Sequence, residues 1–170
     1  MTTGRNLVLT GFMGTGKSTV GRLVAERLSL AFIDTDIEIQ AQAGCSIADI
    51  FAQQGEAAFR RLEAEVCLRV VGNHNQVIAT GGGALLNPEV YRVFAASSLI
   101  VCLTCDLNEI VRRIGGDSAR PLLSGNREQL AQLLARRSDF YNNLPYQFDT
   151  THRDPLQVAE EVSRLWTQNR

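Results

Sequence analysis

The nine residues GFMGTGKST, at positions 11–19, constrain the fold of this chain more than any other feature. They match the pattern G-x-x-x-x-G-K-[ST], with the strand-like run LVLT directly before them and a segment of helical period directly after. Glycines in such a loop let successive backbone N–H groups point at phosphate oxygens, at the positive end of a helix. The motif therefore predicts a phosphate-binding loop between a buried strand and a helix.

The lysine of this motif, Lys17, is the only lysine in the chain, beside sixteen arginines. Its ammonium is a compact point charge, which suits a phosphate-binding loop better than the planar fork of arginine. Guanine-specific switches bind their base through an N-K-x-D element, which needs a second lysine. We therefore expect an adenine nucleotide at this loop.

The rest of the chain alternates between two kinds of segment. Apolar, β-branched runs lie at about residues 7–10, 31–34, 76–79, 99–103 and 147–151, with stretches of helical period between them. This is the pattern of βα units around a parallel sheet. The 170 residues, 45% of them hydrophobic, suffice for one core, so we expect a single domain over 1–170.

Composition and charge narrow the possible partners. Seventeen basic and eighteen acidic residues leave a net charge of −1, which gives no reason to expect binding to nucleic acid or to acidic membranes. No apolar run approaches the length of a membrane span. Cys102 and Cys105 form a C-x-x-C without a second ligand pair, which favours apolar packing over structural zinc. We expect a cytoplasmic monomer.

Two carboxylates follow the second predicted strand, in the run FIDTD. Asp34 and Asp36 should emerge at the carboxyl end of the sheet, where open α/β sheets bind ligands. Asp34 could hold Mg²⁺ together with Ser18, and Asp36 could accept a hydrogen bond from an incoming hydroxyl. Either aspartate could instead cap a helix. Asp106, after LIVCLT, is another metal candidate, but its position favours a helix cap.

The chain resembles the shikimate kinases along nearly its whole length. The resemblance rests on six motifs in the expected order: GFMGTGKSTVGR, FIDTDIEI, SIADIFAQQGEAAFRRLE, VIATGGGALL, ARPLL and RRSDFY. It implies a P-loop kinase fold, with a five-stranded parallel sheet, helices on both faces, a substrate-binding helical segment at about 36–62 and a mobile lid at about 115–126. It also implies transfer of the ATP γ-phosphate to the 3-hydroxyl of shikimate with Mg²⁺, a step of aromatic amino-acid (chorismate) biosynthesis.

The resemblance further implies a role for each matching residue. ATP would be bound by Gly14, Thr15, Gly16, Lys17, Ser18, Thr19, Arg113 and the lid residue Arg120, with Arg112 as an alternative to Arg113 at the adenine. Mg²⁺ would be held by Ser18 and Asp34. Shikimate would be bound by Asp36 at the accepting hydroxyl, by Arg60 and Arg137 at the carboxylate, and by Gly81, Gly82 and Gly83 along the pocket. Catalysis would depend on Lys17, Asp36 and Arg120.

Several alternatives stay open at the level of residues. Glu63, at i+3 from Arg60, could form an ordinary surface pair with it or could equally orient its guanidinium toward a ligand. Arg137 could belong to a solvated basic helix face, and the glycine run could be a simple turn. A kinase for gluconate or for a nucleoside monophosphate could share the phosphate-binding loop. A regulatory module could keep the fold without catalysis.

Overall fold

The computed structural model describes residues 5–115 and 127–169, and its centre is a five-stranded sheet. The strand order is β2-β3-β1-β4-β5, and every neighbouring pair is parallel. The strands are β1 (Asn6–Thr10), β2 (Ala31–Asp34), β3 (Gln76–Ala79), β4 (Ser98–Thr104) and β5 (Gln147–Asp149). All five predicted strands are confirmed, although β5 ends two residues earlier than expected, shortly before a turn at Thr151 and His152.

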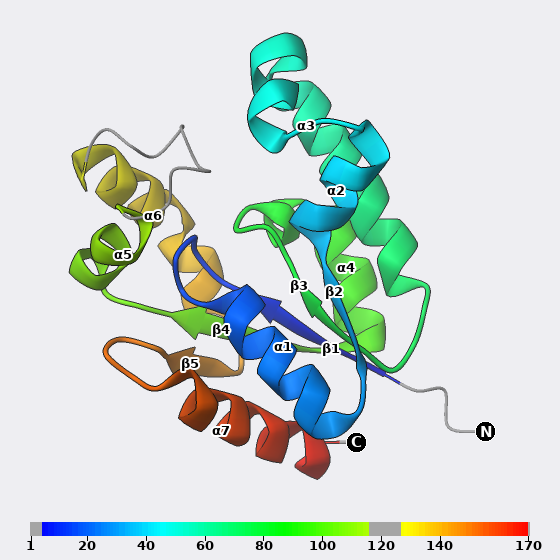
Figure 1. The fold of residues 1–170 in the computed structure, drawn as a ribbon, viewed down its shortest axis with the longest axis vertical. Coiled ribbons are helices and arrows are strands. Elements are labelled where there is room, and N and C mark those ends of the chain that lie inside the picture. Colours follow the sequence, from blue (N-terminus) through cyan, green and yellow to red (C-terminus); the bar gives the residue numbers. More distant parts are fainter. Residues whose placement is uncertain (1–4, 116–126, 170) are drawn as a thin grey trace.

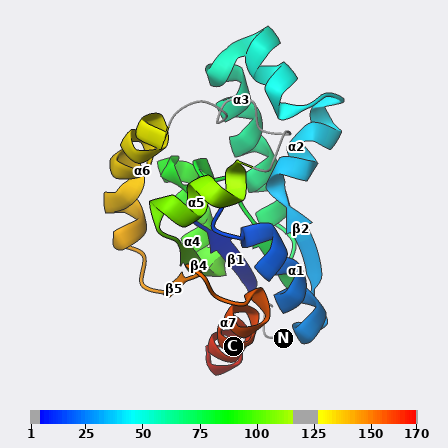
Figure 2. The ribbon, with the colours of Figure 1, turned by 60° about the vertical axis from the view of Figure 1, so that its left-hand side comes forward.

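Helices cover both faces of the sheet (Figure 1 and Figure 2). They are α1 (Lys17–Leu28), α2 (Thr35–Ala43), α3 (Ile47–Val71), the 3₁₀ helix η1 (Ala84–Leu86), α4 (Pro88–Ser97), α5 (Leu107–Ile114), α6 (Arg127–Asn142) and α7 (Pro155–Gln168). Successive residues of a strand point to opposite faces. In β1, Leu7 and Leu9 therefore pack with α1 and α7, whereas Val8 packs with α3 and α4.

The predicted helical pieces over 36–71 are α2 and α3. Asp34 caps α2, and Ser46 and Asp49 form a capping box at the start of α3. Gly55, with φ 81° and ψ 173°, interrupts α3 near its first turns. Figure 1 shows α2 and this part of α3 rising beyond the carboxyl ends of β2 and β3. The helical segment expected at about 36–62 thus exists, although α3 continues to Val71.

Two further predictions concern the second half of the chain. Asp106 caps α5, since its carboxylate accepts a hydrogen bond from Glu109 N, as its sequence position favours. The proposed lid lies almost wholly outside the described residues, and Arg120 lies outside them too. Across residues 5–115 and 127–169, no helix is both long and apolar enough to span a bilayer.

Candidate active site

The phosphate-binding loop joins β1 to α1, as the motif predicts. Gly11, Gly14 and Gly16 have φ values of 132°, 74° and 93°, which L side chains rarely adopt. Space is also short at Gly11, where a Cβ would lie 2.2 Å from the Leu103 carbonyl oxygen. The glycines of the motif are therefore required by the backbone itself.

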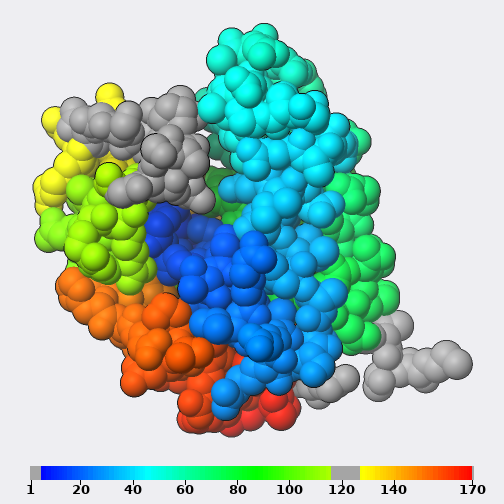
Figure 3. All heavy atoms as spheres, in the orientation of Figure 1, coloured from blue at the N-terminus to red at the C-terminus, as the bar shows by residue number. Residues whose placement is uncertain are grey.

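Beside this loop lies a cavity of about 360 Å³, which is lined by several of the predicted site residues. Its lining comes from the loop and the start of α1, from the β2–α2 junction and from the glycine run, and includes Gly14, Gly16, Lys17, Ser18, Thr19, Asp34, Asp36, Gly81 and Gly82. The Lys17 ammonium donates to the carbonyl oxygens of Gly11 and Phe12, at 2.9 and 2.8 Å. Figure 3 shows this loop and α1, in blue, at the surface between α5 and α2.

Asp34 caps α2, as one reading of its position predicted, and it also bonds to Ser18, its proposed partner at the metal. One carboxylate oxygen accepts the hydroxyl of Ser18 at 2.5 Å, and the other accepts the Asp36 N–H at 3.0 Å as a helix cap. A hydroxyl and a carboxylate side by side are the oxygen ligands that Mg²⁺ prefers. In the described part of the chain, no group of three or more His, Cys, Asp or Glu could hold a metal. This fits Mg²⁺, which commonly keeps waters and substrate phosphates as its other ligands.

The glycine run after β3 is explained by space, because φ is negative at Gly83 and outside the left-handed range at the other two glycines. A Cβ on Gly81 would lie 2.8 Å from Glu63 Oε1 and 3.0 Å from Asp36 Oδ1. A Cβ on Gly83 would lie 2.7 Å from Arg60 Nη1. Charged side chains from α2 and α3 therefore press against this backbone, so the run is more than a turn.

Arg60 does not form the ordinary surface pair that its spacing allowed. Its Nη1 donates to Glu63 Oε2 at 2.6 Å, and the Glu63 side chain is only 5% exposed. Burial raises the pKa of Glu63, against the lowering effect of the Arg60 guanidinium. Glu56 approaches Arg60 from the exposed side, 3.6 Å from its Nε. Arg60 is thus oriented by a buried carboxylate beneath the glycine run.

Arg137 is not on a solvated basic helix face, which was the alternative that the helical pattern allowed. Its guanidinium lies 5.8 Å from the centre of the Phe12 ring, and its Nη1 is 3.3 Å from where a Cβ on Gly82 would be. Together with Arg60 and Gly83 it lines a cavity of about 370 Å³. The two arginines predicted to bind a carboxylate therefore converge on one cavity, from α3 and α6.

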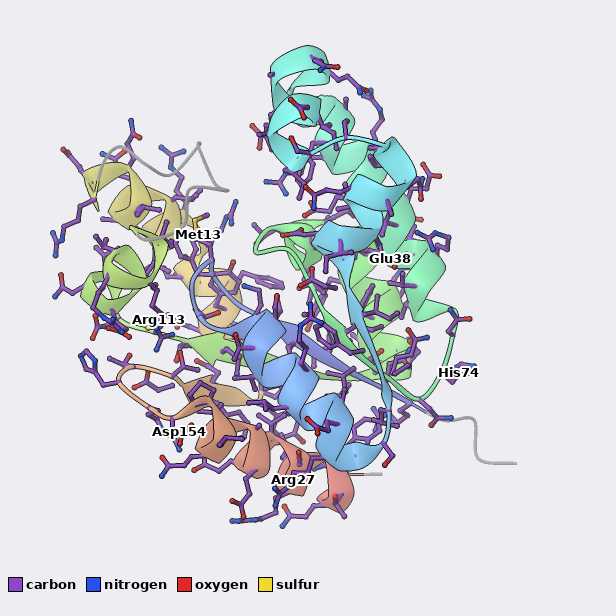
Figure 4. The ribbon with its side chains drawn as sticks, viewed as in Figure 1. Met13, Arg27, Glu38, His74, Arg113 and Asp154 are labelled. Atoms are coloured by element: carbon purple, nitrogen blue, oxygen red, sulfur yellow. The ribbon has the colours of Figure 1, made fainter. Side chains whose placement is uncertain are left out.

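A third cavity, of about 570 Å³, lies between the start of α1, α5 and the turn before α7. Its lining includes Thr15, Gly16, Thr19, Arg112, Arg113 and Pro155. Both arginines bond to Glu109: Arg112 donates two hydrogen bonds at 2.7 Å and Arg113 one at 2.8 Å. These hydrogen bonds, with the larger effect from Arg112 and the smaller from Arg113, lower the pKa of Glu109 to about 2. Figure 4 shows Arg113 between α5 and the turn that leads to Asp154.

Three polar residues near the site, Glu109, Tyr141 and Thr150, were not assigned a role by sequence reasoning. Glu109 was detectable, because E-x-x-R-R places it one turn before two arginines. Tyr141 lies one turn after Arg137, and its hydroxyl donates to the Gly82 carbonyl. Burial raises the pKa of this tyrosine to about 12. Thr150 and the buried state of Glu63 left no signal, because spacing does not reveal burial.

The cysteine pair behaves as packing residues. Cys102 and Cys105 both belong to the core beneath α5, and both are free thiols. Burial raises the pKa of Cys102 to about 11, which disfavours the thiolate needed for metal binding or nucleophilic attack.

Comparison with known proteins agrees with this geometry. A family model described as shikimate kinase matches residues 13–166. A shikimate kinase of Geobacter sulfurreducens is 44% identical over 162 residues, which cover 94% of this chain and 90% of that protein. A shikimate kinase of Persephonella marina is 39% identical, with 93% and 96% covered.

A solved structure gives the same answer for the fold. The shikimate kinase of Acinetobacter baumannii, determined in complex with shikimate, superposes with a TM-score of 0.92 at 32% identity. The alignment covers 99% of this chain and 96% of that one. The phosphate-binding loop, the sheet order and the matches over almost the full length lead to one conclusion: this chain belongs to the shikimate kinase family.

Proposed function

We propose that this chain transfers the γ-phosphoryl group of ATP to the 3-hydroxyl of shikimate, giving shikimate 3-phosphate for aromatic amino-acid biosynthesis. The observation that carries the proposal is the convergence of Asp36, Arg60 and Arg137 on the glycine run, directly beside the phosphate-binding loop. An acid near the loop and two arginines farther away match an acceptor that has a hydroxyl at one end and a carboxylate at the other.

On the donor side, the loop and the start of α1 bind the phosphates, through Gly14, Thr15, Gly16, Lys17, Ser18 and Thr19. The base occupies the 570 Å³ cavity. Arg113 contacts it with the face of its guanidinium, since the edge already bonds to Glu109, Gly14 and Thr150. Arg112, with 71% of its side chain exposed, borders the same cavity.

Mg²⁺ fits at Ser18 and Asp34, whose oxygens lie 2.5 Å apart at the edge of the phosphate cavity. When bound with the nucleotide, it neutralises charge on the transferring phosphoryl group. Ser18 and Asp34 contribute by holding their oxygens in one place, because the cap of α2 fixes the carboxylate.

On the acceptor side, Arg60 and Arg137 bind the carboxylate of shikimate, and Asp36 accepts a hydrogen bond from its 3-hydroxyl. Gly81, Gly82 and Gly83 let the ring lie against the backbone. Phosphoryl transfer runs through a loose transition state, so positioning and charge neutralisation dominate its catalysis. Asp36 orients the hydroxyl, and Lys17 and Arg120 stabilise the transferring charge.

The remaining assignments complete the proposal. The chain is a single domain over 1–170, in which the helices at about 36–62 hold shikimate and residues 115–126 close over ATP. It acts in the cytoplasm, as a monomer, on ATP and shikimate, without nucleic-acid or membrane partners.

A coupled assay of ADP release tests the function directly. The purified chain, with ATP and Mg²⁺, should release ADP quickly only when shikimate is added. Gluconate and nucleoside monophosphates serve as control acceptors and should give no more than the background rate. Equal stimulation by gluconate, or no stimulation by any acceptor, would overturn the proposal in favour of another sugar kinase or of a regulatory module.

A further inference from the structure

The carbonyl oxygens of the phosphate-binding loop are held by side chains, and two of these side chains come from outside the loop. Within the motif, Lys17 donates to the carbonyls of Gly11 and Phe12, and Thr15 Oγ1 donates to Phe12 at 2.8 Å. From α5, Arg113 Nη1 donates to the Gly14 carbonyl at 3.1 Å. From the turn after β5, Thr150 Oγ1 donates to the Thr15 carbonyl at 3.0 Å.

Thr150 is well placed for this bond. It is 4% exposed, and its backbone N–H donates to the Thr104 carbonyl at 2.8 Å, which fixes it to the end of β4. A hydroxyl has one proton to donate. Its Oγ1 lies 3.0 Å from both the Thr104 and Thr15 carbonyls, but Thr104 already has the backbone donor. Because the Thr104 carbonyl already has that donor, we assign the hydroxyl proton to the Thr15 carbonyl; Arg113 donates to the same Oγ1 at 3.1 Å.

The direction of this carbonyl matters because the peptide group is planar and trans, so that its C=O and N–H point in opposite directions. The Thr15 carbonyl shares its peptide group with the N–H of Gly16. Gly16 has φ 93° and no side chain to restrain it, so the peptide before it could rotate at low cost. A bond that holds the Thr15 carbonyl toward Thr150 therefore holds the Gly16 N–H in the opposite direction, away from Thr150, and Gly16 also lines the 360 Å³ cavity, which Thr150 does not.

We propose that Thr150 is a positioning residue for the phosphate-binding loop: its hydroxyl fixes the Thr15–Gly16 peptide so that the Gly16 N–H is aimed at the phosphates before ATP binds. The inference rests on the proposed use of ATP. Thr150 touches the loop and not the phosphates. Its loss should weaken binding of the phosphate chain more than binding of the base, because Arg113 keeps its bonds to Glu109 and to the Thr150 carbonyl.

The test is Thr150→Val, which removes the hydroxyl and keeps the shape. Calorimetric titration should show inorganic tripolyphosphate bound about tenfold more weakly, the scale of one lost hydrogen bond with a buried partner. Adenosine binding should change less than twofold. The KM for ATP should rise by a similar factor, with a smaller change in kcat. Thr150→Ser, which restores the hydroxyl, should recover most of the tripolyphosphate affinity.

A matched control is Thr167→Val in α7, where the lost hydroxyl donates only to the Ser163 carbonyl, at 2.9 Å, within the same helix. This variant should bind tripolyphosphate like the wild type. Wild-type affinity in Thr150→Val, equal losses for tripolyphosphate and adenosine, or a Thr150→Ser as weak as Thr150→Val would each overturn the inference. These results would leave the proposed function intact as long as the wild type consumes ATP with shikimate. A wild type that binds neither tripolyphosphate nor ATP would overturn both.

Discussion

At the proposed shikimate site (the acceptor side) and at the proposed ATP site (the nucleotide side), arginine bonds to a buried glutamate. The pKa of that glutamate is shifted in opposite directions at the two sites. On the nucleotide side, Arg112 and Arg113 together hold the pKa of Glu109 at about 2. On the acceptor side, burial outweighs the single hydrogen bond from Arg60, and Asp36 adds repulsion, so that the pKa of Glu63 is raised.

The difference bears on what each side would receive under the proposed function. Glu109 fixes its two arginines and offsets one of their two positive charges, and their flat faces would be left to the base. Arg137 lies against Phe12 and the glycine run. Arg60 bonds to Glu63, whose carboxylate is repelled by that of Asp36. Under the proposed function, an incoming carboxylate would be held by both guanidinium groups against the repulsion of Glu63 and Asp36, so its binding should depend strongly on each arginine. On the nucleotide side, two guanidinium groups share one carboxylate, which leaves a net positive charge beside the phosphate-binding loop.

Lys17→Met should have the largest effect, on the nucleotide side. It removes the point charge that stabilises the transferring phosphoryl group, which costs about 3 kcal/mol or more in the transition state and lowers kcat at least about a hundredfold. Steady-state kinetics measures the loss, and circular dichroism should show an unchanged fold. Near-normal turnover would remove Lys17 from the catalytic assignment.

Arg60→Ala and Arg137→Ala should each damage the acceptor side alone. Truncating one partner of a shielded ion pair costs about 2–5 kcal/mol, which predicts a loss in kcat/KM for shikimate of roughly thirtyfold to a few thousandfold. The KM for ATP should change far less. Arg136→Ala, at the exposed neighbour in α6, is the matched control and should stay near wild type.

The substrate itself offers a second test of these arginines. Shikimate methyl ester lacks the carboxylate charge and should be a poor substrate for the wild type. It should lose much less than shikimate on going to either arginine variant, since the interaction is already absent. If the ester is phosphorylated as well as the acid, the carboxylate site is elsewhere.

Substitutions of Asp34 and Asp36, which lie between the two sides, should have different effects on activity. Asp34→Asn weakens the oxygen pair with Ser18 and should raise the Mg²⁺ concentration needed for half-maximal activity. Asp36→Asn should lower kcat with little change in that Mg²⁺ requirement or in ATP binding. Magnesium titrations of both variants check this. The reverse pattern would exchange their roles.

A smaller effect is expected from Tyr141→Phe, which removes the hydroxyl that holds the Gly82 carbonyl. The KM for shikimate should rise about three- to tenfold, and the KM for ATP should stay the same. Tyr146→Phe is the control, because its hydroxyl bonds to Asn169 near the end of the chain, 3.4 Å away. A rise in the KM for ATP would show that the two sides are not separable at this residue.

The smallest effects, in opposite directions, should appear in the pH dependence of stability. A folded-state pKa of about 2 for Glu109 means that wild type is stabilised relative to Glu109→Gln above about pH 4.5 and loses this advantage as the pH falls toward 2. The raised pKa of Glu63 has the reverse sign. Wild type should gain stability relative to Glu63→Gln as the pH falls through that raised pKa toward 4.5.

Thermal unfolding of wild type and both variants between about pH 7 and pH 2 measures these differences. Titrating groups that all three proteins share cancel in each difference. Slopes of the same sign would show that the two glutamates have similar environments, and the contrast between the two sides would fail.

The sequence predicted the elements that depend on local pattern. The alternation of apolar runs located all five strands, and the glycines and lysine of the motif located the loop between β1 and α1. The same local logic explains its limits. Glu63 at i+3 from Arg60 fits a surface partner, and its spacing does not reveal that its side chain is buried against the glycine run after β3.

Contacts between distant parts of the chain were the least predictable. Thr150 meets Thr15 across 135 residues, and Tyr141 meets Gly82 across 59, so no periodicity relates them. Arg60 and Arg137 were paired only through the family resemblance. Their convergence on one cavity joins α3 and α6, which lie far apart in the sequence and which no local pattern relates.

The close packing of charged side chains against the glycine run also limits how the acceptor pocket could be redesigned. The run offers no side chain to shorten, and a single added methyl at Gly81 or Gly83 would displace the carboxylates or the Arg60 guanidinium. Space for a bulkier acid must therefore come from another part of the lining of the 370 Å³ cavity, such as Leu86, which is exposed and carries no charge. Engineered variants with new acceptors should begin there, and leave the three glycines unchanged.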